Sequence, residues 1–386
     1  MRPLLKPTVL LCPGHDGYLA YDTDSEQLHR LNPLAALIAE LADGRRTEDD
    51  ILNAVVPLLG RLDRDGCKAW MAHAVIVGLL IDAESSPPHS AMSGDALHRL
   101  ATELRYRDRV LAAFVCQQRA VELNQDDPLL WYQLGELAHI VGRRAEARAA
   151  YERYQSTHPD DAEIAHLLIA LRDEAPPARV SDRCIEQLYG HFASFYDQNM
   201  CGDLDYRAPD LLFTALDAGS GSRRDLAALD LGCGTGLFGQ RIKPVASRLV
   251  GIDLSAAMID RARERGIYDR LEVAELTEWL RRQPAEQFDV IAICDTLIYF
   301  GDLTDVLQYA RRHLAPRGRI GFTVEKGTTS PFLLTDSGRF SHHRDHLLAV
   351  ASTTGYSVLS QTEEVLRYEY GEPVTGWVTV LGEQDE

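Results

Sequence analysis

The sequence is poor in the features that mark secreted, membrane-spanning or nucleic-acid-binding proteins. Its seven cysteines are odd in number and scattered, without a C-x-x-C pair, which argues against a disulfide framework or a zinc site. The longest clean apolar run, Ala74 to Ile81, is too short to span a bilayer, and the first residues lack a signal-peptide pattern. Basic residues number 40 against 58 acidic ones, and the net charge of −18 disfavours nucleic acid or an anionic membrane as partner. We therefore expect a cytoplasmic protein with neither of these partners.

Two stretches rich in proline and serine divide the 386 residues into three blocks. Glu84 to Gly94 and Asp173 to Ser181 have the composition of linkers. The domains that this predicts are 1–84, 95–172 and 181–386, in a multidomain α/β protein. Hydrophobic residues make up 45% of the chain, which is enough to build buried cores.

The first block has the pattern of a small winged-helix-like α+β domain. TVLLC, the turn PGHDG and YLAYDT predict a hairpin of two strands. Asn32 is a natural N-cap for an apolar helix that ends near Gly44, and Thr47 with Asp50 forms a capping-box-like start to a second helix. A third helix is expected from Trp70 through Leu80.

This block resembles the PqqD-like domains, also called RiPP recognition elements. The resemblance lies in the strand pair followed by LNPLAALIAELADGRRTEDDIL. It implies that the domain binds the leader of a precursor peptide as an added strand at its sheet edge. The alternative is a small regulatory or packing domain without a peptide ligand.

The second block contains an internal repeat with a period of 34 residues, in which Leu100 recurs as Leu134. Between Trp131 and Pro159 the spacing of aromatic and small residues follows the tetratricopeptide pattern, and a partial third unit begins near Ala162. We expect tetratricopeptide-like helical repeats at the centre of the chain. They serve either as a spacer or scaffold, which we favour slightly, or as a peptide-binding groove.

The third block alternates strand-like and helical segments, which predicts a parallel, doubly wound Rossmann-like sheet. Its first strand runs into LDLGCGTGLFG, Leu229 to Gly239, which contains both G-x-G-x-x-G and D-x-G-x-G-x-G. In a dinucleotide site the first glycine of G-x-G-x-x-G directly follows the strand. Here the strand ends at Gly232, and the G-x-G-x-x-G frame begins two residues later, at Gly234. Asp230 places a carboxylate at the strand end, where it suits an ammonium or sulfonium better than a pyrophosphate. The loop therefore favours S-adenosyl-L-methionine over a nicotinamide.

The third block resembles the class I S-adenosylmethionine-dependent methyltransferases that are fused to tetratricopeptide repeats. The shared stretches include YGHFASFYDQNM, the glycine loop, CDTLIYFGDL, SGRFSHH and RYEYGEPVTG. Tyr189 and Gly190 replace the family's usual Phe-Asp. The resemblance implies a cofactor site made of the loop and strand-end residues and of two aromatic residues in the leading helix: Asp230, Gly232, Gly234, Gly236, Asp253, Leu254, Glu275, Asp295, Phe192 and Tyr196.

The methyl acceptor is less well indicated. CDTLIY lacks the prolines of the N-P-P-Y motif, which argues against methylation of DNA bases or glutamine. The candidate acceptor-side residues are Tyr299, Glu325, Arg339, His342, His343 and Arg367. Among them Tyr299, Arg339, His342 and His343 are the candidate catalytic residues, with a histidine as base or polar clamp. Either arginine could hold a carboxylate, although an ion pair with Glu369 or Glu372 explains Arg367 equally well. We expect no metal site.

Together these patterns favour a methyltransferase that modifies a ribosomally made precursor peptide, with the leader bound by the first domain. O-methylation of a carboxylate, which needs no base, is preferred to N- or C-methylation. The alternatives are a small-molecule methyltransferase with regulatory N-terminal domains and a non-catalytic peptide-binding scaffold.

Overall fold

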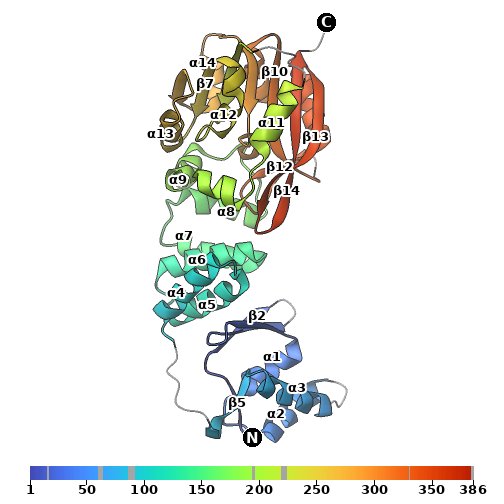
Figure 1. The fold of residues 1–386 in the computed structure, drawn as a ribbon. Coiled ribbons are helices and arrows are strands. Elements are labelled where there is room, and N and C mark those ends of the chain that lie inside the picture. The colour runs from blue at the N-terminus through green and yellow to red at the C-terminus, as the bar shows by residue number, and fades with distance from the viewer. Residues whose placement is uncertain are drawn as a thin grey trace. The chain divides into compact units, whose positions relative to one another are not determined.

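The computed structural model describes residues 1–14, 17–59, 64–85, 92–193, 196–218, 224–329 and 331–383 (Figure 1). They form two compact units, Met1–Thr157 and His158–Glu386. Residues 15 and 16 of the expected hairpin turn and residues 86–91 of the first expected linker lie outside the described residues. Over the ranges that are described, no helix has both the length and the apolar character needed to cross a bilayer.

The first unit contains two small sheets and a series of helices. Its elements are β1 (Pro3–Leu5), β2 (Val9–Gly14), β3 (Gly17–Asp22), β4 (Gln27–Leu31), α1 (Pro33–Leu41), α2 (Glu48–Val55), α3 (Arg64–Ile76), β5 (Leu80–Asp82), α4 (Gly94–Tyr106), α5 (Val110–Leu123), α6 (Pro128–Ile140) and α7 (Arg144–Gln155). The antiparallel sheet runs in the order β2-β3-β4, while β1 pairs with β5.

Local capping explains where the first helices begin. The Asn32 side chain accepts from the Ala35 amide at 2.8 Å and starts α1. Thr47 and Asp50 form the expected reciprocal capping box at the start of α2. The third helix ends earlier than predicted, at Ile76, because Leu80 belongs to strand β5 and pairs with Leu5. Strand β4 was not foreseen.

The predicted repeats form consecutive helices. α4 packs on α5, α5 on α6 and α6 on α7. A side chain at Gly135 in α6 would collide with the ring of Tyr151 in α7, so this glycine lets the two helices approach closely. Helix α8 (Ala162–Leu171), which begins where the partial third unit was expected, belongs to the second unit. The tetratricopeptide and winged-helix assignments remain predictions.

The second unit is built around one large sheet. Its other elements are α9 (Asp182–Phe192), α10 (Tyr196–Gln198), α11 (Ala208–Asp217), β6 (Leu226–Leu231), α12 (Leu237–Ile242), β7 (Ala246–Asp253), α13 (Ala256–Glu264), β8 (Arg270–Val273), α14 (Leu276–Arg282), β9 (Phe288–Ile293), the short 3₁₀ helix η5 (Leu297–Tyr299), α15 (Thr304–Arg311), β10 (Leu314–Lys326), β11 (Phe332–Leu334), β12 (Phe340–His342), α16 (Arg344–Thr353), β13 (Tyr356–Glu369) and β14 (Glu372–Glu383).

The centre of this sheet is parallel, in the order β10-β9-β6-β7-β8, as the Rossmann-like prediction requires. The long hairpin β13–β14 extends it, with β14 antiparallel to β10. Buried residues alternate between its two faces: Leu229 packs on the side of α14 to α16, whereas its neighbour Ala228 packs on the side of α11 and α12. Residues that follow β6, β7, β8 and β9 therefore meet at one edge.

The end of the second expected linker is hydrogen-bonded to the second unit. Val180 donates its amide to the Tyr299 carbonyl, and Gly301 donates to the Ala178 carbonyl, both at 2.9 Å. These bonds dock the chain against η5 just before helix α9 begins. The end of the expected linker is thus part of the second unit.

Candidate active site

The glycine loop after β6 forms a turn that only glycine can adopt easily. Gly232, Gly234 and Gly236 all have positive φ angles, of 71°, 53° and 93°. A Cβ at Gly232 would collide with the Thr296 side chain, whereas one at Gly234 would find no atom within 4 Å among the described residues. Gly236 is the N-cap of α12. The loop therefore packs closely on one side and stays open on the other.

Asp230 is the buried acid of this loop. Its side chain has no solvent exposure, and its Oδ2 accepts from the Tyr268 hydroxyl at 2.7 Å. Its Oδ1 is buried without a hydrogen-bond partner in the described part of the chain. Burial raises the pKa of Asp230 to about 7, against the lowering effect of the Tyr268 bond. An unsatisfied buried carboxylate oxygen calls for a cationic or N–H group beside it.

The next two strand ends also present acids. Asp253 accepts from the amides of Gly234 and Ser255, each at 2.8 Å. Glu275 is the N-cap of α14 and accepts from the amides of Thr277 at 3.1 Å and Glu278 at 2.8 Å. These backbone amides hold both carboxylates in place, and each oxygen keeps a lone pair for a ligand.

A cavity lies along this edge of the sheet, with about 690 Å³ of empty space when the solvent at its mouth is included. Its lining includes eight of the predicted site residues: Tyr196, Gly232, Gly234, Asp253, Leu254, Glu275, Asp295 and Tyr299. A smaller cavity of about 310 Å³ shares Tyr196, Gly232 and Gly234 with it and is lined by Asp230. Phe192 lines neither cavity, but its ring packs edge-on against that of Tyr196, with 5.4 Å between the ring centroids. The structure thus gathers most of the predicted cofactor residues around one space.

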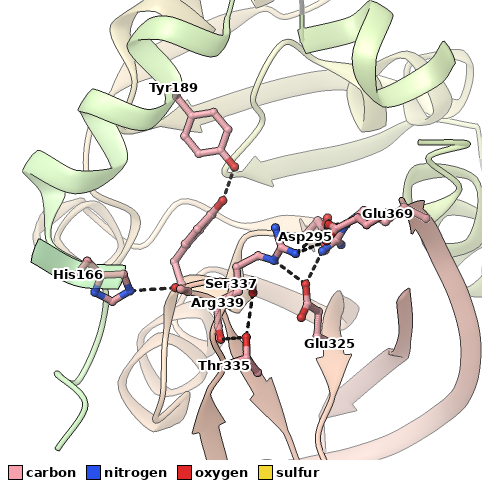
Figure 2. A network of polar contacts seen from close by, with 11 residues as sticks. His166, Tyr189, Asp295, Glu325, Thr335, Ser337, Arg339 and Glu369 are labelled. Atoms are coloured by element: carbon pink, nitrogen blue, oxygen red, sulfur yellow. Dashed lines mark hydrogen bonds and ion pairs between the residues drawn. The ribbon is translucent and has the colours of Figure 1, made fainter. Parts of the chain in front are cut away.

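Helix α9 contacts the cavity wall through a tyrosine pair. The hydroxyl of Tyr189 lies 2.5 Å from that of Tyr299, and the two rings are perpendicular (Figure 2). Both residues line the cavity, and burial raises the pKa of Tyr299 to about 12. Tyr299 is therefore held as a neutral hydroxyl, and its partner Tyr189 stands at the position where the family pattern was not followed.

Three of the acceptor-side candidates, Glu325, Arg339 and Arg367, meet beside Asp295 in one network of charges. Figure 2 shows Asp295, Glu325, Arg339 and Glu369 of this network. The Arg367 side chain is only 3% exposed and donates to Asp295 Oδ2 at 3.0 Å, to Glu369 Oε1 at 2.7 Å and to Glu325. Arg339 donates to Glu325 at 2.7 Å and to both oxygens of Glu369 at 2.7 and 2.8 Å. The expectation of an ion pair between Arg367 and Glu369 is met, and both arginines are already occupied by carboxylates of the protein.

The candidate histidines lie away from the cavity lining. His342 is buried in β12, and its Nε2–H donates to the Gly301 carbonyl at 3.0 Å. Burial lowers its pKa to about 4, so it is neutral near pH 7. His343 is the N-cap of α16, where its Nδ1 accepts from the Asp345 amide at 3.2 Å. Each histidine therefore has a structural hydrogen bond, and a role of either one as a base or polar clamp stays a prediction.

Two residues that hold the site in place escaped the sequence reading. Tyr268, which bonds Asp230, lies 38 residues further along the chain, and its ring fills the space beside Gly236, Gly239 and Gly251. Thr296, which follows the carboxyl end of β9, packs its side chain against Gly232. Tyr268 belongs to no recognisable motif, and Thr296, although it lies in CDTLIYFGDL, was not singled out. Several closely packed glycines were the available sign that a bulky partner lies opposite.

Comparisons with known proteins agree with this geometry. A family model described as a methyltransferase domain matches residues 229–320. Malonyl-[acyl-carrier protein] O-methyltransferase of Salmonella typhimurium is 30% identical over 147 residues, which cover 38% of this chain and 55% of that protein. A ubiquinone biosynthesis O-methyltransferase of Histophilus somni is 29% identical over 117 residues, covering 28% and 49%. The chain thus spans about half the length of the curated relatives it matches.

Among solved structures, magnesium protoporphyrin IX methyltransferase from Synechocystis with bound S-adenosylmethionine has a TM-score of 0.42 and 13% identity. It covers 54% of this chain and 100% of its own. The family match confirms the prediction of a methyltransferase domain with a Rossmann-like fold and of S-adenosyl-L-methionine as its cofactor. The predicted repeat fusion and the PqqD-like character of the first domain remain predictions.

Proposed function

We propose that this protein is an active S-adenosylmethionine-dependent methyltransferase that modifies a ribosomally made peptide. The observation that supports catalysis most directly is the pairing of an open glycine loop with two buried, unsatisfied carboxylate oxygens. Oδ1 of Asp230 and Oδ1 of Asp295 have no partner in the residues that are described. Both residues line cavities that meet at Gly232 and Gly234. A cationic ligand would relieve both of these buried oxygens.

These residues fit the cofactor group by group. Asp253 and Glu275 lie at the strand ends where ribose hydroxyls and an adenine amine would find acceptors, and Leu254 adds an apolar wall. Gly234 lets a ligand approach the backbone closely, and Asp230 would meet the ammonium of the methionine portion. When bound, S-adenosylmethionine supplies an electrophilic methyl group on a sulfonium. The protein's own task is to align the acceptor with it and to exclude water.

Calorimetric titration of the full chain with S-adenosylmethionine tests the enzyme part. Asp253→Ala should weaken binding at least tenfold, because it removes a charged hydrogen-bond acceptor from the cavity and from the Gly234 amide. Asp260→Ala is a matched control, since that aspartate lies on the exposed side of α13. No binding by the natural chain, or equal binding by both variants, would count against the proposal.

The peptide part rests on the first unit. Strand β4 is an outer strand that pairs only with β3 in the described residues, and its Gln27 and Arg30 are exposed. Such an edge offers unpaired backbone groups to an added strand.

Incubation with a precursor peptide encoded by a short gene beside this one should give a mass gain of one CH₂. The leader half of that peptide, added in excess, should inhibit. Methylation of the core half alone at full efficiency would argue against leader recognition.

A small-molecule acceptor is the second candidate. The relatives named above are a malonyl-[acyl-carrier protein] O-methyltransferase and a ubiquinone biosynthesis O-methyltransferase, and neither name indicates a ribosomal peptide. The cavity wall opposite the cofactor residues includes Ile185 and Phe300, which suits an apolar acceptor. Full activity on a small acceptor with no response to the peptide would favour this reading.

A further inference from the structure

Asp295 carries a buried carboxylate oxygen that the protein leaves free. It follows β9 with a φ of +52°, a strained value for a residue with a side chain, and donates its amide to Thr323 Oγ1 at 2.8 Å. Its Oδ2 accepts from Arg367 at 3.0 Å, whereas its Oδ1 has no partner in the ranges that the structure describes. Asp295 lines the cavity, and its buried Oδ1 still needs a hydrogen-bond donor, which a ligand in the cavity could supply.

The two arginines beside it are not available. The Nε, Nη1 and Nη2 of Arg367 each meet a protein carboxylate, and Arg339 holds Glu325 and Glu369. A substrate carboxylate would have to displace one of these acids from a buried ion pair, which is costly. The arginines therefore complete a scaffold around Asp295 and do not form an open anion site.

The net charge of the acids and arginines around Asp295 also disfavours a charged acceptor. Three carboxylates (Asp295, Glu325 and Glu369) face two guanidinium groups (Arg339 and Arg367), so the ionised cluster has one excess negative charge. Its centre at Arg367 and Asp295 is buried, whereas the side chains of Arg339 and Glu369 are 23% and 26% exposed. The sulfonium of the proposed cofactor would neutralise this excess charge. A neutral acceptor keeps that balance, whereas a carboxylate or an ammonium would bring another charge into a poorly solvated site.

We infer that the methyl acceptor is a neutral hydroxyl, best a phenol, whose O–H is bound by Oδ1 of Asp295; this inference rests on the proposed function. The acceptor oxygen bonds to the methyl carbon as the carbon–sulfur bond breaks, with that electron pair staying on sulfur. The hydroxyl proton moves to Oδ1 of Asp295 and then to water. The products are a methyl ether and S-adenosylhomocysteine. This assigns a hydroxyl where the sequence favoured a carboxylate.

The environment suits Asp295 to this role. Burial raises its pKa, and Arg367 counteracts that rise by favouring the ionised form. A carboxylate whose pKa is higher than usual is a stronger proton acceptor in its ionised form. The rings of Tyr189 and Tyr299 line the same cavity and give an aromatic acceptor surfaces to pack on.

Selectivity of the natural protein gives the first test and needs no variant. The chain, first shown to bind S-adenosylhomocysteine, is loaded with sinefungin, a non-transferring analogue that keeps a positive charge at the position of the sulfonium. It is then titrated with three probes of one skeleton: p-cresol, p-toluate and p-methylbenzylamine. We expect p-cresol to bind at least tenfold tighter than either charged probe. N-acetyltyrosinamide, tested in parallel, separates a peptide phenol from a free one. Weaker or absent binding of p-cresol, or tighter binding of a charged probe, would overturn the inference. Failure to bind S-adenosylhomocysteine would instead overturn the proposed function.

Asp295→Asn provides the second test. It keeps the size of the side chain but removes the base, so binding of p-cresol should weaken about tenfold. Its methylation rate should fall by about 10²-fold or more. Affinity for S-adenosylhomocysteine, which lacks the sulfonium charge, should change only a few-fold when measured by calorimetry. Asp302→Asn, at an exposed acid seven positions on, should change none of these values. Unchanged p-cresol binding and rate in a folded Asp295→Asn protein would contradict the assignment.

Discussion

The two sides of the cavity hold their carboxylates by different means. On the cofactor side, Asp253 and Glu275 accept backbone amides that lie within a few residues or on the adjacent loop. On the acceptor side, Asp295, Glu325 and Glu369 are held by the side chains of Arg339, just before β12, and of Arg367 in β13. One side is therefore secured by main-chain geometry and the other by buried ion pairs between distant segments.

This difference has an energetic consequence. A backbone amide needs no side-chain ordering to hold a carboxylate, and the bond is lost only when the loop itself changes. A buried ion pair leaves an uncompensated charge as soon as one partner is removed. We therefore expect substitutions on the acceptor side to affect folding strongly, whereas those on the cofactor side should affect ligand binding more than stability.

The largest effect is expected for Arg367→Met. It leaves three buried carboxylates with Arg339 as their remaining cation in the network, so stability should fall by about 3–5 kcal/mol. Urea unfolding measures this loss. Arg344→Met, at an exposed arginine in α16, should cost less than about 0.5 kcal/mol. If the two variants were equally stable, the acceptor side would not depend on its ion pairs.

An intermediate effect is expected for the glycine loop, where two neighbouring glycines should behave differently. Gly232→Ala combines a positive φ with a collision against Thr296 and should lower stability by about 1–3 kcal/mol. Gly234→Ala meets no atom within 4 Å in the described chain and should cost about 1 kcal/mol, while obstructing the cavity. Thermal unfolding without ligand, paired with calorimetry, separates the two. Parallel losses in both assays would show that the loop acts as one rigid unit.

The smallest effect is expected for Glu275→Ala. It removes the N-cap of α14 and should lower stability by about 1 kcal/mol, with a few-fold loss of cofactor affinity. Glu264→Ala, on the exposed end of α13, is the comparison variant and should be nearly neutral. A loss as large as that of Arg367→Met would remove the contrast between the two sides of the cavity.

The cofactor side was largely predictable because its residues are local signals. Gly232 ends a buried strand, Asp230 precedes it by two residues, and Asp253 and Glu275 follow the next two strands. Parallel strands bring their carboxyl ends to one edge, so identifying the strands was enough to group these residues. Tyr268 could not be grouped in this way, since it reaches the loop from the segment before β8 and belongs to no motif. Thr296 lies at the same sheet edge after β9, but no local pattern showed that its side chain packs on Gly232.

The amino-acid sequence by itself determined the alternating strands and helices from β6 to β10, the glycine loop and the acids at the strand ends, because periodicity, caps and glycine positions act over a few residues. Only the tertiary structure decided that Arg339 and Arg367 are bound by Glu325 and Glu369, that His342 is buried away from the cavity and that Asp295 keeps a free oxygen. These facts depend on the register of β10, β12 and the β13–β14 hairpin. Long-range pairing of this kind sets which charges are neutralised, and no local pattern records it.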